Sequence, residues 1–430
     1  METTRRSEFE DLLDPVKLPK VALVESPVDT PPAIPDIRAG VRDALGAVEL
    51  PAGSVAIGVG SRGVARVGEV VAALVEALKE AGASPFVVPA MGSHGASTAE
   101  GQARVLAHLG VSEELVGCPV RATMDSVKLG TTPSAGVDVY MDRHAYEADS
   151  VVVVNRVKPH TAFRGSVESG PTKMLAIGLG KQKGAHSIHI AGWDKLHTTI
   201  PEAARISISE GNVAFGLAVL ENAHEEPCEI SAIPADRLEA EEPKLLEEAK
   251  RNLARLPFTD LDVLVVDEIG KNISGDGADP NVTGRYPTPY ASGGPNIERI
   301  VFLALTEETG GNANGVGLAD VVTERLASRM ERSSTYMNAL TAAVSETVKT
   351  PMVMPSDRLA IAAALEMCAG VNPPEARLVR IANTLKPNRM HVSESLLEIS
   401  KELGLKILEE PTEMRFDPDG DLARGGSHGR

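Results

Sequence analysis

The sequence predicts an α/β protein of two domains, each built on a mostly parallel, doubly wound sheet, with the active site in the cleft between them. Three observations support this fold class. Apolar runs of strand length alternate with helical patterns along the chain. The runs are continuous and rich in valine, as at residues 151–154, which is typical of strands covered on both faces. A length of 430 residues is also too great for one ordinary core.

The first half of the chain supplies most of these elements. Strands are expected at residues 21–24, 55–59, 85–88, 151–154 and 213–220. Helices are expected at residues 67–81 and 98–109. Ser97 and Glu100 match a capping box, which would start the second helix just after His94 and leave this histidine in a loop.

A charged, proline-interrupted stretch at residues 232–257 separates this half from a second α/β unit. The stretch is mostly one predicted helix, and the unit after it is expected to hold strands at 261–270 and 299–305 and a helix at 357–368. We therefore predict an N-terminal domain at 1–258, a C-terminal domain at 259–415 and a disordered, polar, glycine-rich tail at 416–430.

Composition narrows the class of protein. A net charge of −17 argues against nucleic acid or an acidic membrane surface as a partner. No apolar run approaches the roughly 20 residues that span a bilayer, and the N-terminus lacks the apolar core of a signal peptide. The three cysteines follow no ligand spacing and are predicted to be reduced thiols: Cys118, Cys228 and Cys368. These observations predict a cytoplasmic protein.

Three predicted strands each run into a loop of unusual chemistry. The strand at 55–59 leads into GSRG, the strand at 85–88 into MGSHGAS, and the strand at 151–154 into NRVKPH. Ligands of doubly wound sheets bind beyond the carboxyl ends of the strands. We therefore expect the three loops to converge on one site.

The GVGSRG segment has three interpretations. It matches G-x-G-x-x-G between a strand and a helix, and its Gly60, Ser61 and Arg62 suit a phosphate or carboxylate. The acidic residue that would close the next strand and hold a ribose is missing, because that strand ends in FVVPA. The segment is thus a dinucleotide site, another anion contact through Arg62, or a plain tight turn.

His94 and His160 each follow a predicted strand, and neither belongs to a helical stripe. Two opposed imidazoles suit a reaction that works on both mirror forms of one substrate. The alternative for each histidine is a purely structural role.

The segment KGAHSIH is predicted to be helical, which places His186 and His189 on one face, downstream of Lys173. Such spacing suits metal ligands, but zinc would need a third protein ligand that the neighbouring sequence lacks. The alternative is a pair of surface histidines.

Taken together, the segments GSHGASTAEGQ, NRVKPHTAFRG and SGPTKMLAIGLGKQKGAHSIH resemble the nickel-pincer lactate racemase family, in the same order across most of the first 260 residues. Members of that family use a tethered nicotinic-acid-derived mononucleotide that grips nickel through two sulfurs and one ring carbon. The resemblance implies that Lys173 carries this cofactor as a thioamide and that His189 is the nickel ligand, with His186 as second choice. It implies that His94 and His160 are the paired acid and base.

The resemblance also implies contacts outside this core. Arg62 would contact the substrate carboxylate or the cofactor, together with Gly60 and Ser61. The family's acidic residue three positions before the arginine is Val59 here, which leaves the cofactor ribose or phosphate contacts open. Lys271 is the nearest candidate for a substrate-binding lysine of the second domain, with a solvated loop as the alternative. Trp193 either lines the site or merely packs.

We therefore predict a racemase or 2-epimerase of a small-molecule 2-hydroxy carboxylate, dependent on nickel and the nickel-pincer nucleotide and on partner enzymes that make this cofactor. A 3% content of aromatic residues favours a small or polyhydroxylated acid. Two alternatives stay open, an NAD-dependent 2-hydroxy acid dehydrogenase and a non-catalytic nucleotide- or carboxylate-binding protein. The protein is expected to be a monomer or a homodimer.

Overall fold

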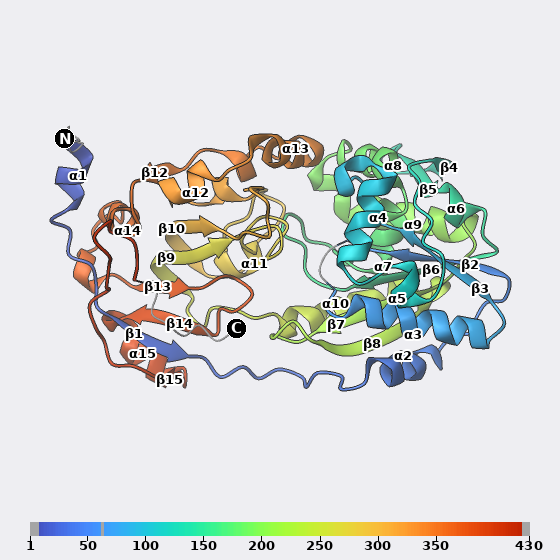
Figure 1. Ribbon diagram of the computed structural model, residues 1–430, viewed down its shortest axis with the longest axis horizontal. Coiled ribbons are helices and arrows are strands. Elements are labelled where there is room, and N and C mark those ends of the chain that lie inside the picture. The colour runs from blue at the N-terminus through green and yellow to red at the C-terminus, as the bar shows by residue number, and fades with distance from the viewer. Residues whose placement is uncertain (1–7, 62–63, 424–430) are drawn as a thin grey trace. The chain divides into compact units, whose positions relative to one another are not determined.

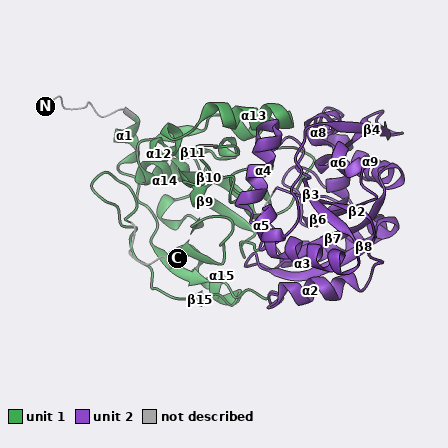
Figure 2. Cartoon of the chain, turned by 45° about the vertical axis from the view of Figure 1, so that its right-hand side comes forward, with its two compact units in different colours: residues 1–29, 254–430 green, residues 30–253 purple. Residues whose placement is uncertain are grey.

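The computed structural model describes residues 8–61 and 64–423 (Figure 1). Its contacts divide the chain into two compact units (Figure 2). Unit 2 comprises residues 30–253, and unit 1 comprises residues 254–423 together with residues 8–29. Both units are mixed α/β structures, which confirms the prediction of a two-domain α/β fold.

Unit 2 is built on a five-stranded sheet of order β3-β2-β6-β7-β8. In that order the strands are Ser84–Pro89, Ser54–Val59, Ser150–Arg156, Val213–Glu221 and Pro227–Pro234. The first four run parallel, and β8 is antiparallel to β7. A separate hairpin consists of β4 (Ser126–Thr131) and β5 (Asp138–Asp142).

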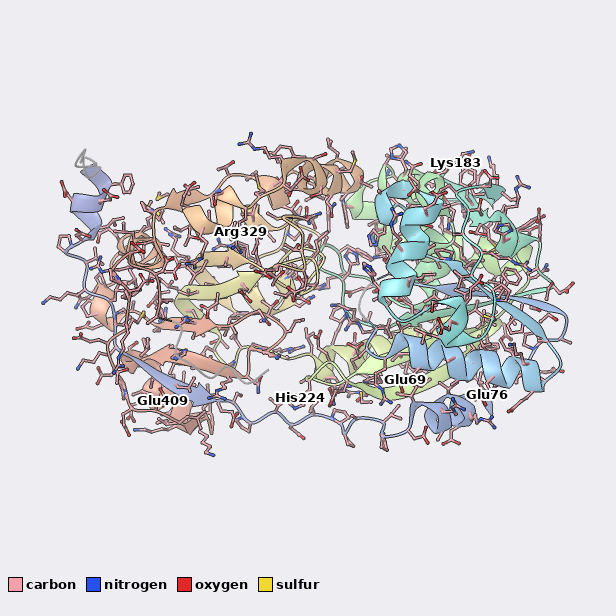
Figure 3. The ribbon with its side chains drawn as sticks, viewed as in Figure 1. Glu69, Glu76, Lys183, His224, Arg329 and Glu409 are labelled. Carbon is pink, nitrogen blue, oxygen red and sulfur yellow. The ribbon has the colours of Figure 1, made fainter. Side chains whose placement is uncertain are left out.

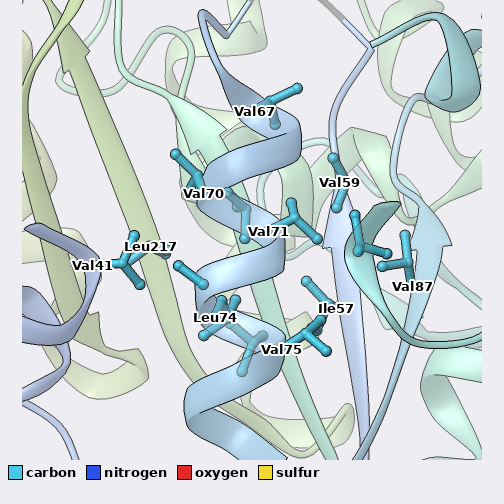
Figure 4. Packing of buried hydrophobic residues seen from close by; sticks show 14 of the residues in the cluster. Val41, Ile57, Val59, Val67, Val70, Val71, Leu74, Val75, Val87 and Leu217 are labelled. Atoms are coloured by element: carbon cyan, nitrogen blue, oxygen red, sulfur yellow. The ribbon is translucent and has the colours of Figure 1, made fainter. Parts of the chain in front are cut away.

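Helices cover both faces of this sheet, as the valine-rich strands predict. Alternate residues of β2 point to opposite faces, so Ile57 and Val59 pack beneath α3 (Val67–Glu80) while Ala56 joins the core on the other side. Figure 4 shows the apolar face of α3 against these strand residues. The other helices of unit 2 are α2 (Ile37–Leu45), α4 (Ala99–His108), α5 (Glu113–Val116), α6 (Arg143–Tyr146), α7 (Pro171–Lys173), η2 (Met174–Gly178), α8 (Lys181–His189), η3 (Trp193–Lys195), α9 (Leu196–Glu210), η4 (Ala235–Arg237) and α10 (Leu238–Asn252), with η1 (Gly95–Ser97) before α4.

Unit 1 is built on an eight-stranded sheet of order β12-β11-β10-β9-β13-β14-β1-β15. In that order the strands are Met352–Met354, Val321–Thr323, Asn296–Leu305, Asp260–Ile269, Leu378–Ile381, Arg389–Ser393, Val21–Glu25 and Lys406–Ile407. The strands from β12 to β13 are parallel, and the last three are antiparallel. Its helices are α1 (Glu8–Leu13), α11 (Pro280–Thr283), η5 (Val316–Leu318), α12 (Glu324–Ser328), α13 (Arg332–Ala342), η6 (Glu346–Val348), α14 (Asp357–Glu366), η7 (Pro373–Glu375), η8 (Glu394–Leu396) and α15 (Leu397–Glu402).

Two sequence-based expectations about domain limits differ from this structure. The strand β1 belongs to unit 1, where it pairs with β14 and β15, although the sequence prediction placed it in the N-terminal domain. A short apolar run carries no information about which sheet receives it, and that is the reason for the error.

The predicted disordered tail is ordered as far as residue 423. Leu422 is buried, and a bridge joins it to Phe416. Asp421 forms an ion pair with Arg325 and accepts a hydrogen bond from the backbone N–H of Asp357. Residues 424–430 lie outside the described residues.

Among the described residues, no helix has the length and apolar character needed to cross a membrane.

Candidate active site

The topology of unit 2 marks one edge of its sheet as the place for a ligand. From β2 the chain moves outward to β3, and it later returns to β6 on the opposite side of β2. The loops that follow β2 and β6 therefore leave in opposite directions from neighbouring carboxyl ends, which opens a crevice at such switch points. Gly60 and Ser61 follow β2, and His160 follows β6.

Contacts at this edge bring the lysine-bearing segment to the end of β2. A Cβ atom added to Gly60 would lie 2.7 Å from the Oδ1 of Asn155 and 3.3 Å from the Sδ of Met174. The backbone after β2 therefore packs closely against the end of β6 and against the residue that follows Lys173. Arg62 lies outside the described residues, so its predicted anion contact stays a prediction.

His94 lies at this same edge, in the loop after β3. Its Nδ1 makes a short hydrogen bond with the hydroxyl of Ser61, which joins the loops after β2 and β3. The buried side chain of Gln102 donates to the carbonyls of Gly92 (2.8 Å) and His94 (3.2 Å). Because Gly92 also donates its N–H to Gly178 at 3.0 Å, the loop is fixed to the segment that follows Lys173.

A left-handed turn directly after His94 holds the histidine loop in an unusual conformation. Gly95, Ala96 and Ser97 all have positive φ angles, of 66°, 56° and 56°. Ser97 therefore does not cap α4 as predicted, and its hydroxyl donates to the Ser93 carbonyl instead. Thr98 is the N-cap, since its Oγ1 accepts the N–H of Gly101 at 3.0 Å. Strained backbone of this kind collects at functional sites.

Replacing Gly95 with alanine is expected to lower the free energy of unfolding by about 2 to 4 kcal/mol, through the left-handed φ and the added contact. The new Cβ would lie 2.5 Å from the backbone N of Gln102, which cannot move without disturbing α4. Gly136→Ala is the matched control, because Gly136 has a φ of 64° and open space around its Cβ position. Urea unfolding of both variants checks this, and equal losses would contradict the steric argument.

A buried carboxylate shapes the loop that carries His160. The Oε2 of Glu168 accepts the backbone N–H of His160 at 2.8 Å, and Glu168 is only 1% exposed. Its charge is met by Arg164 at 3.2 Å and by Lys250, from α10, at 3.3 Å. Arg164 also donates to the carbonyl of His160 at 2.6 Å. The main chain at His160 is therefore held from both its N–H and its C=O.

Aromatic contacts link His160 to the predicted metal ligand. The His160 ring lies 4.6 Å from the Phe163 ring and 6.0 Å from the Trp193 ring, centroid to centroid. Trp193 in turn stacks on His189 at 5.8 Å. Trp193 thus lies within ring-contact distance of both histidines, whereas His186 is exposed on α8, as is Lys183 (Figure 3).

Lys173 ends the three-residue helix α7 and is half-buried. The next five residues, Met174–Gly178, form a π-helix whose wider turn is closed by the N–H of Leu179 bonding to the Met174 carbonyl at 2.8 Å. Such turns are rare and occur often at functional sites. This π-helix was not predicted, and the glycines of LAIGLG are its main signal in the sequence.

Glu242, from α10, is a second feature that the sequence analysis missed. It is 1% exposed, and its Oε2 accepts both the N–H (2.9 Å) and the hydroxyl (2.6 Å) of Thr172, the residue before Lys173. Burial raises the pKa of the Glu242 carboxyl to about 7, although the two bonds from Thr172 oppose the shift. In the sequence it is one of several glutamates in a charged helix, so no local pattern distinguishes it.

The free energy of unfolding is expected to depend on pH through the Glu242 carboxyl. A folded-state pKa above the ordinary value of 4.5 stabilises the fold below pH 4.5, and this contribution is lost as the pH rises through about 7. Glu242→Gln cannot titrate, so its free energy of unfolding should gain on the wild type by up to about 3 kcal/mol between pH 4.5 and 8. Glu239→Gln, exposed on the same helix, is the control. Parallel pH profiles for wild type and Glu242→Gln in urea unfolding would contradict the assignment.

Lys181 is a buried cation at the start of α8. Its Nζ donates to the Pro89 carbonyl at the end of β3 (2.9 Å) and pairs with Asp142 at 3.2 Å. Burial lowers the pKa of Lys181 and raises that of Asp142, and their attraction partly offsets both shifts. This pair ties α8 to the strand that precedes His94, and it too was missed from sequence.

Lys271 belongs to unit 1, in the loop after β9. Its Nζ donates to the carbonyl of Gly275 at 2.7 Å, and its backbone N–H donates to Thr309 at 3.0 Å. These bonds stabilise its own loop, and its predicted contact with substrate stays a prediction.

Comparisons with known proteins agree with this fold. Residues 62–235, within unit 2, match the family model described as a domain of unknown function, DUF362. No curated protein matches the chain. The lactate racemase apoprotein from Thermoanaerobacterium thermosaccharolyticum is similar in structure, with a TM-score of 0.51, 13% identity, and coverage of 85% of this chain and 94% of that chain. The protein therefore has the fold of lactate racemase, as the resemblance of its motifs predicted.

Proposed function

We propose that the protein is a racemase or 2-epimerase of a 2-hydroxy carboxylate and that it works with a nickel-pincer nucleotide tethered at Lys173. Two sets of contacts in unit 2 support this proposal, one between the ends of β2, β3 and β6 and the segment after Lys173, and one around Trp193. Ser61 bonds to His94, Gly60 packs near Met174, and Trp193 contacts both His160 and His189. A shared fold with lactate racemase supports the same class of reaction.

The chemistry of the substrate explains why such a cofactor is needed. The α-proton of a 2-hydroxy carboxylate is very weakly acidic, because the neighbouring carboxylate already carries negative charge. Removing hydride together with the hydroxyl proton leaves a planar 2-keto acid instead, which can be reduced on either face. The tethered nucleotide would supply the hydride acceptor. The chain itself would bind the acid and exchange the proton of its hydroxyl through His94 and His160.

The residues present fit the proposed cofactor. Lys173 is half-buried at a fixed turn, and His189 is half-buried against Trp193. Within the described residues, no group of three or more His, Cys, Asp or Glu side chains is placed to hold a metal by itself. A metal at His189 would therefore take its other ligands from the proposed cofactor. The two sulfurs and one ring carbon of that cofactor would be three soft donors, and together with one imidazole they suit square-planar nickel.

Intact mass spectrometry tests the proposal on protein produced together with the enzymes that make the cofactor. We expect a mass increase of one nucleotide that maps to Lys173, about one nickel per chain, and inversion of a 2-hydroxy acid without added NAD. Protein that carries neither the adduct nor nickel under these conditions would refute it. Net oxidation that requires NAD would instead support a dehydrogenase, a function that the missing acidic residue at the end of β3 disfavours.

A further inference from the structure

We propose that Glu242 is a positioning residue for the tether, because it fixes the turn that carries Lys173 to the helix α10. This inference rests on the proposed function, and it adds a residue that lies outside the three segments in which the sequence resembles the racemase family. The evidence is the way in which Glu242 caps the first turn of α7 from a distant part of the chain.

The start of α7 has no N-cap side chain of its own. The N-cap residue is Gly170, and Pro171 follows it without a backbone N–H. The first N–H of the helix is therefore that of Thr172, and it donates to the Oε2 of Glu242 at 2.9 Å. The Thr172 hydroxyl donates to the same oxygen at 2.6 Å. A carboxyl group from α10 thus takes the place of the usual N-cap side chain.

Gly170 leaves the space that this carboxyl group occupies. A Cβ atom added to Gly170 would lie 2.3 Å from the Oε1 of Glu242 and 2.9 Å from its Cδ. The φ of Gly170 is 165°, an extended value that other residues adopt, so the glycine is needed for space and not for its backbone conformation. The missing side chain at position 170 and the carboxyl group from α10 are therefore complementary.

Two other elements hold the same segment. A Cβ atom added to Gly216, in β7, would lie 2.7 Å from the Cβ of Pro171, so the start of α7 packs directly on the sheet. The buried hydroxyl of Ser207, from α9, donates to the Leu175 carbonyl in the π-helix at 3.0 Å. Lys173 lies between Pro171 and Leu175 in the chain. The position of its backbone is therefore set from β7, α9 and α10.

The hydrogen bonds from Thr172 do not require a charge on Glu242. Burial raises the pKa of this carboxyl to about 7, so both of its protonation states are populated near neutral pH. Its Oε1 is buried and accepts no hydrogen bond from the described residues. With a proton on Oε1, the Oε2 atom still accepts from Thr172. Glutamine should therefore preserve the positioning, although it cannot titrate.

Positioning matters because the proposed cofactor would be held at two points, the tether at Lys173 and the metal ligand His189. A lysine side chain is long and flexible, so its backbone must be fixed if both points are to be reached together. Misplacement by about 1 Å can lower a rate on the order of 10²-fold. Because other residues would bind the substrate, the loss of Glu242 should affect cofactor loading and kcat rather than KM.

Hydrogen exchange of the apoprotein tests the inference without cofactor. Glu242→Ala should speed exchange at residues 172–175 by about tenfold or more, whereas Glu242→Gln should stay within about threefold of wild type. Glu239→Ala, exposed on the same helix, is the control and should leave this exchange unchanged. Wild-type exchange in Glu242→Ala, or equally fast exchange in Glu242→Gln and Glu242→Ala, would overturn the inference.

Protein produced together with the enzymes that make the cofactor provides the second measurement. Glu242→Ala should carry about fivefold less adduct at Lys173, and its kcat per adduct should fall by about tenfold or more while KM stays within about twofold of wild type. Glu242→Gln should restore most of the adduct and of kcat.

The residue that donates to Glu242 supplies a second pair of variants, which keeps the test available if Glu242→Ala does not fold. Thr172→Val loses the hydroxyl bond with little change of volume and should lower loading and kcat in the same way, whereas Thr172→Ser keeps the bond and should match wild type. Full loading and kcat in Thr172→Val and in Glu242→Ala would overturn the inference. Wild-type protein without adduct would refute the proposed function, and hydrogen exchange would still decide whether Glu242 fixes this turn.

Discussion

Lys173→Ala is expected to abolish both the covalent adduct and the inversion of substrate, while the free energy of unfolding changes by no more than about 1 kcal/mol. The proposed tether needs an amine, and alanine removes it without disturbing a helical turn, since alanine is the best helix former. Bonds from Thr172 to Glu242 fix this turn, and the Lys173→Ala variant keeps both residues. Intact mass, nickel content and urea unfolding measure the three expectations.

The matched control for this variant is Lys183→Ala. Lys183 lies ten residues further along the chain, exposed on α8, with its Nζ 4.5 Å from the centroid of the Tyr140 ring (Figure 3). We expect this variant to keep the adduct, the nickel and the activity. An adduct that persists in Lys173→Ala, or one that is lost in Lys183→Ala as well, would show that the tether lies elsewhere.

Much of the fold follows from the sequence because the strongest signals are local. The valine run of β6 is fully buried, as continuous apolar strands predict, and β2, β3 and β6 are parallel neighbours. Parallel neighbours end at the same edge, so three loops that look separate in the sequence converge in space. The position of β1 depends instead on pairing with β14, far along the chain, and no local pattern encodes that choice.

The residues of the candidate site also divide into those that the sequence reveals and those that it does not. His94, His160, Lys173 and His189 stand out because histidine and lysine in glycine- or proline-rich loops are uncommon in cores. The residues that hold these side chains in place are not recognisable in the sequence, since a glutamate such as Glu168 or Glu242 differs from a surface glutamate only because it is buried. Burial depends on tertiary packing, which gives these carboxyls partners far along the chain.

The structure distinguishes two histidines that the sequence does not. Spacing and position make His94 and His160 look equivalent, since each follows a strand in the same sheet. In the structure the two Nδ1 atoms have different partners, since that of His94 bonds to the hydroxyl of Ser61 and that of His160 accepts the main-chain N–H of Ala162. Hydrogen-bond direction of this kind depends on the local turn and has no signature in residue type.

Glu168→Ala is expected to lower the free energy of unfolding by about 3 kcal/mol or more and to reduce activity strongly, because it removes the buried carboxylate that Arg164 and Lys250 share. The carboxylate accepts from the N–H of His160 and pairs with Arg164 and Lys250, and its side chain is fully buried. Without it the turn from 160 to 162 loses the hydrogen bond that fixes its start.

Two further variants separate charge from packing at this position. Glu168→Gln keeps an oxygen that can accept the N–H of His160, so we expect it to retain more activity than Glu168→Ala while still destabilising the ion pairs. Glu247 pairs with the same Lys250 at 2.9 Å, but its side chain is 68% exposed. Glu247→Ala should therefore cost less than about 0.5 kcal/mol, since exposed ion pairs contribute little. Urea unfolding that gives Glu168→Ala and Glu247→Ala equal losses would show that burial of the carboxylate does not stabilise the His160 loop.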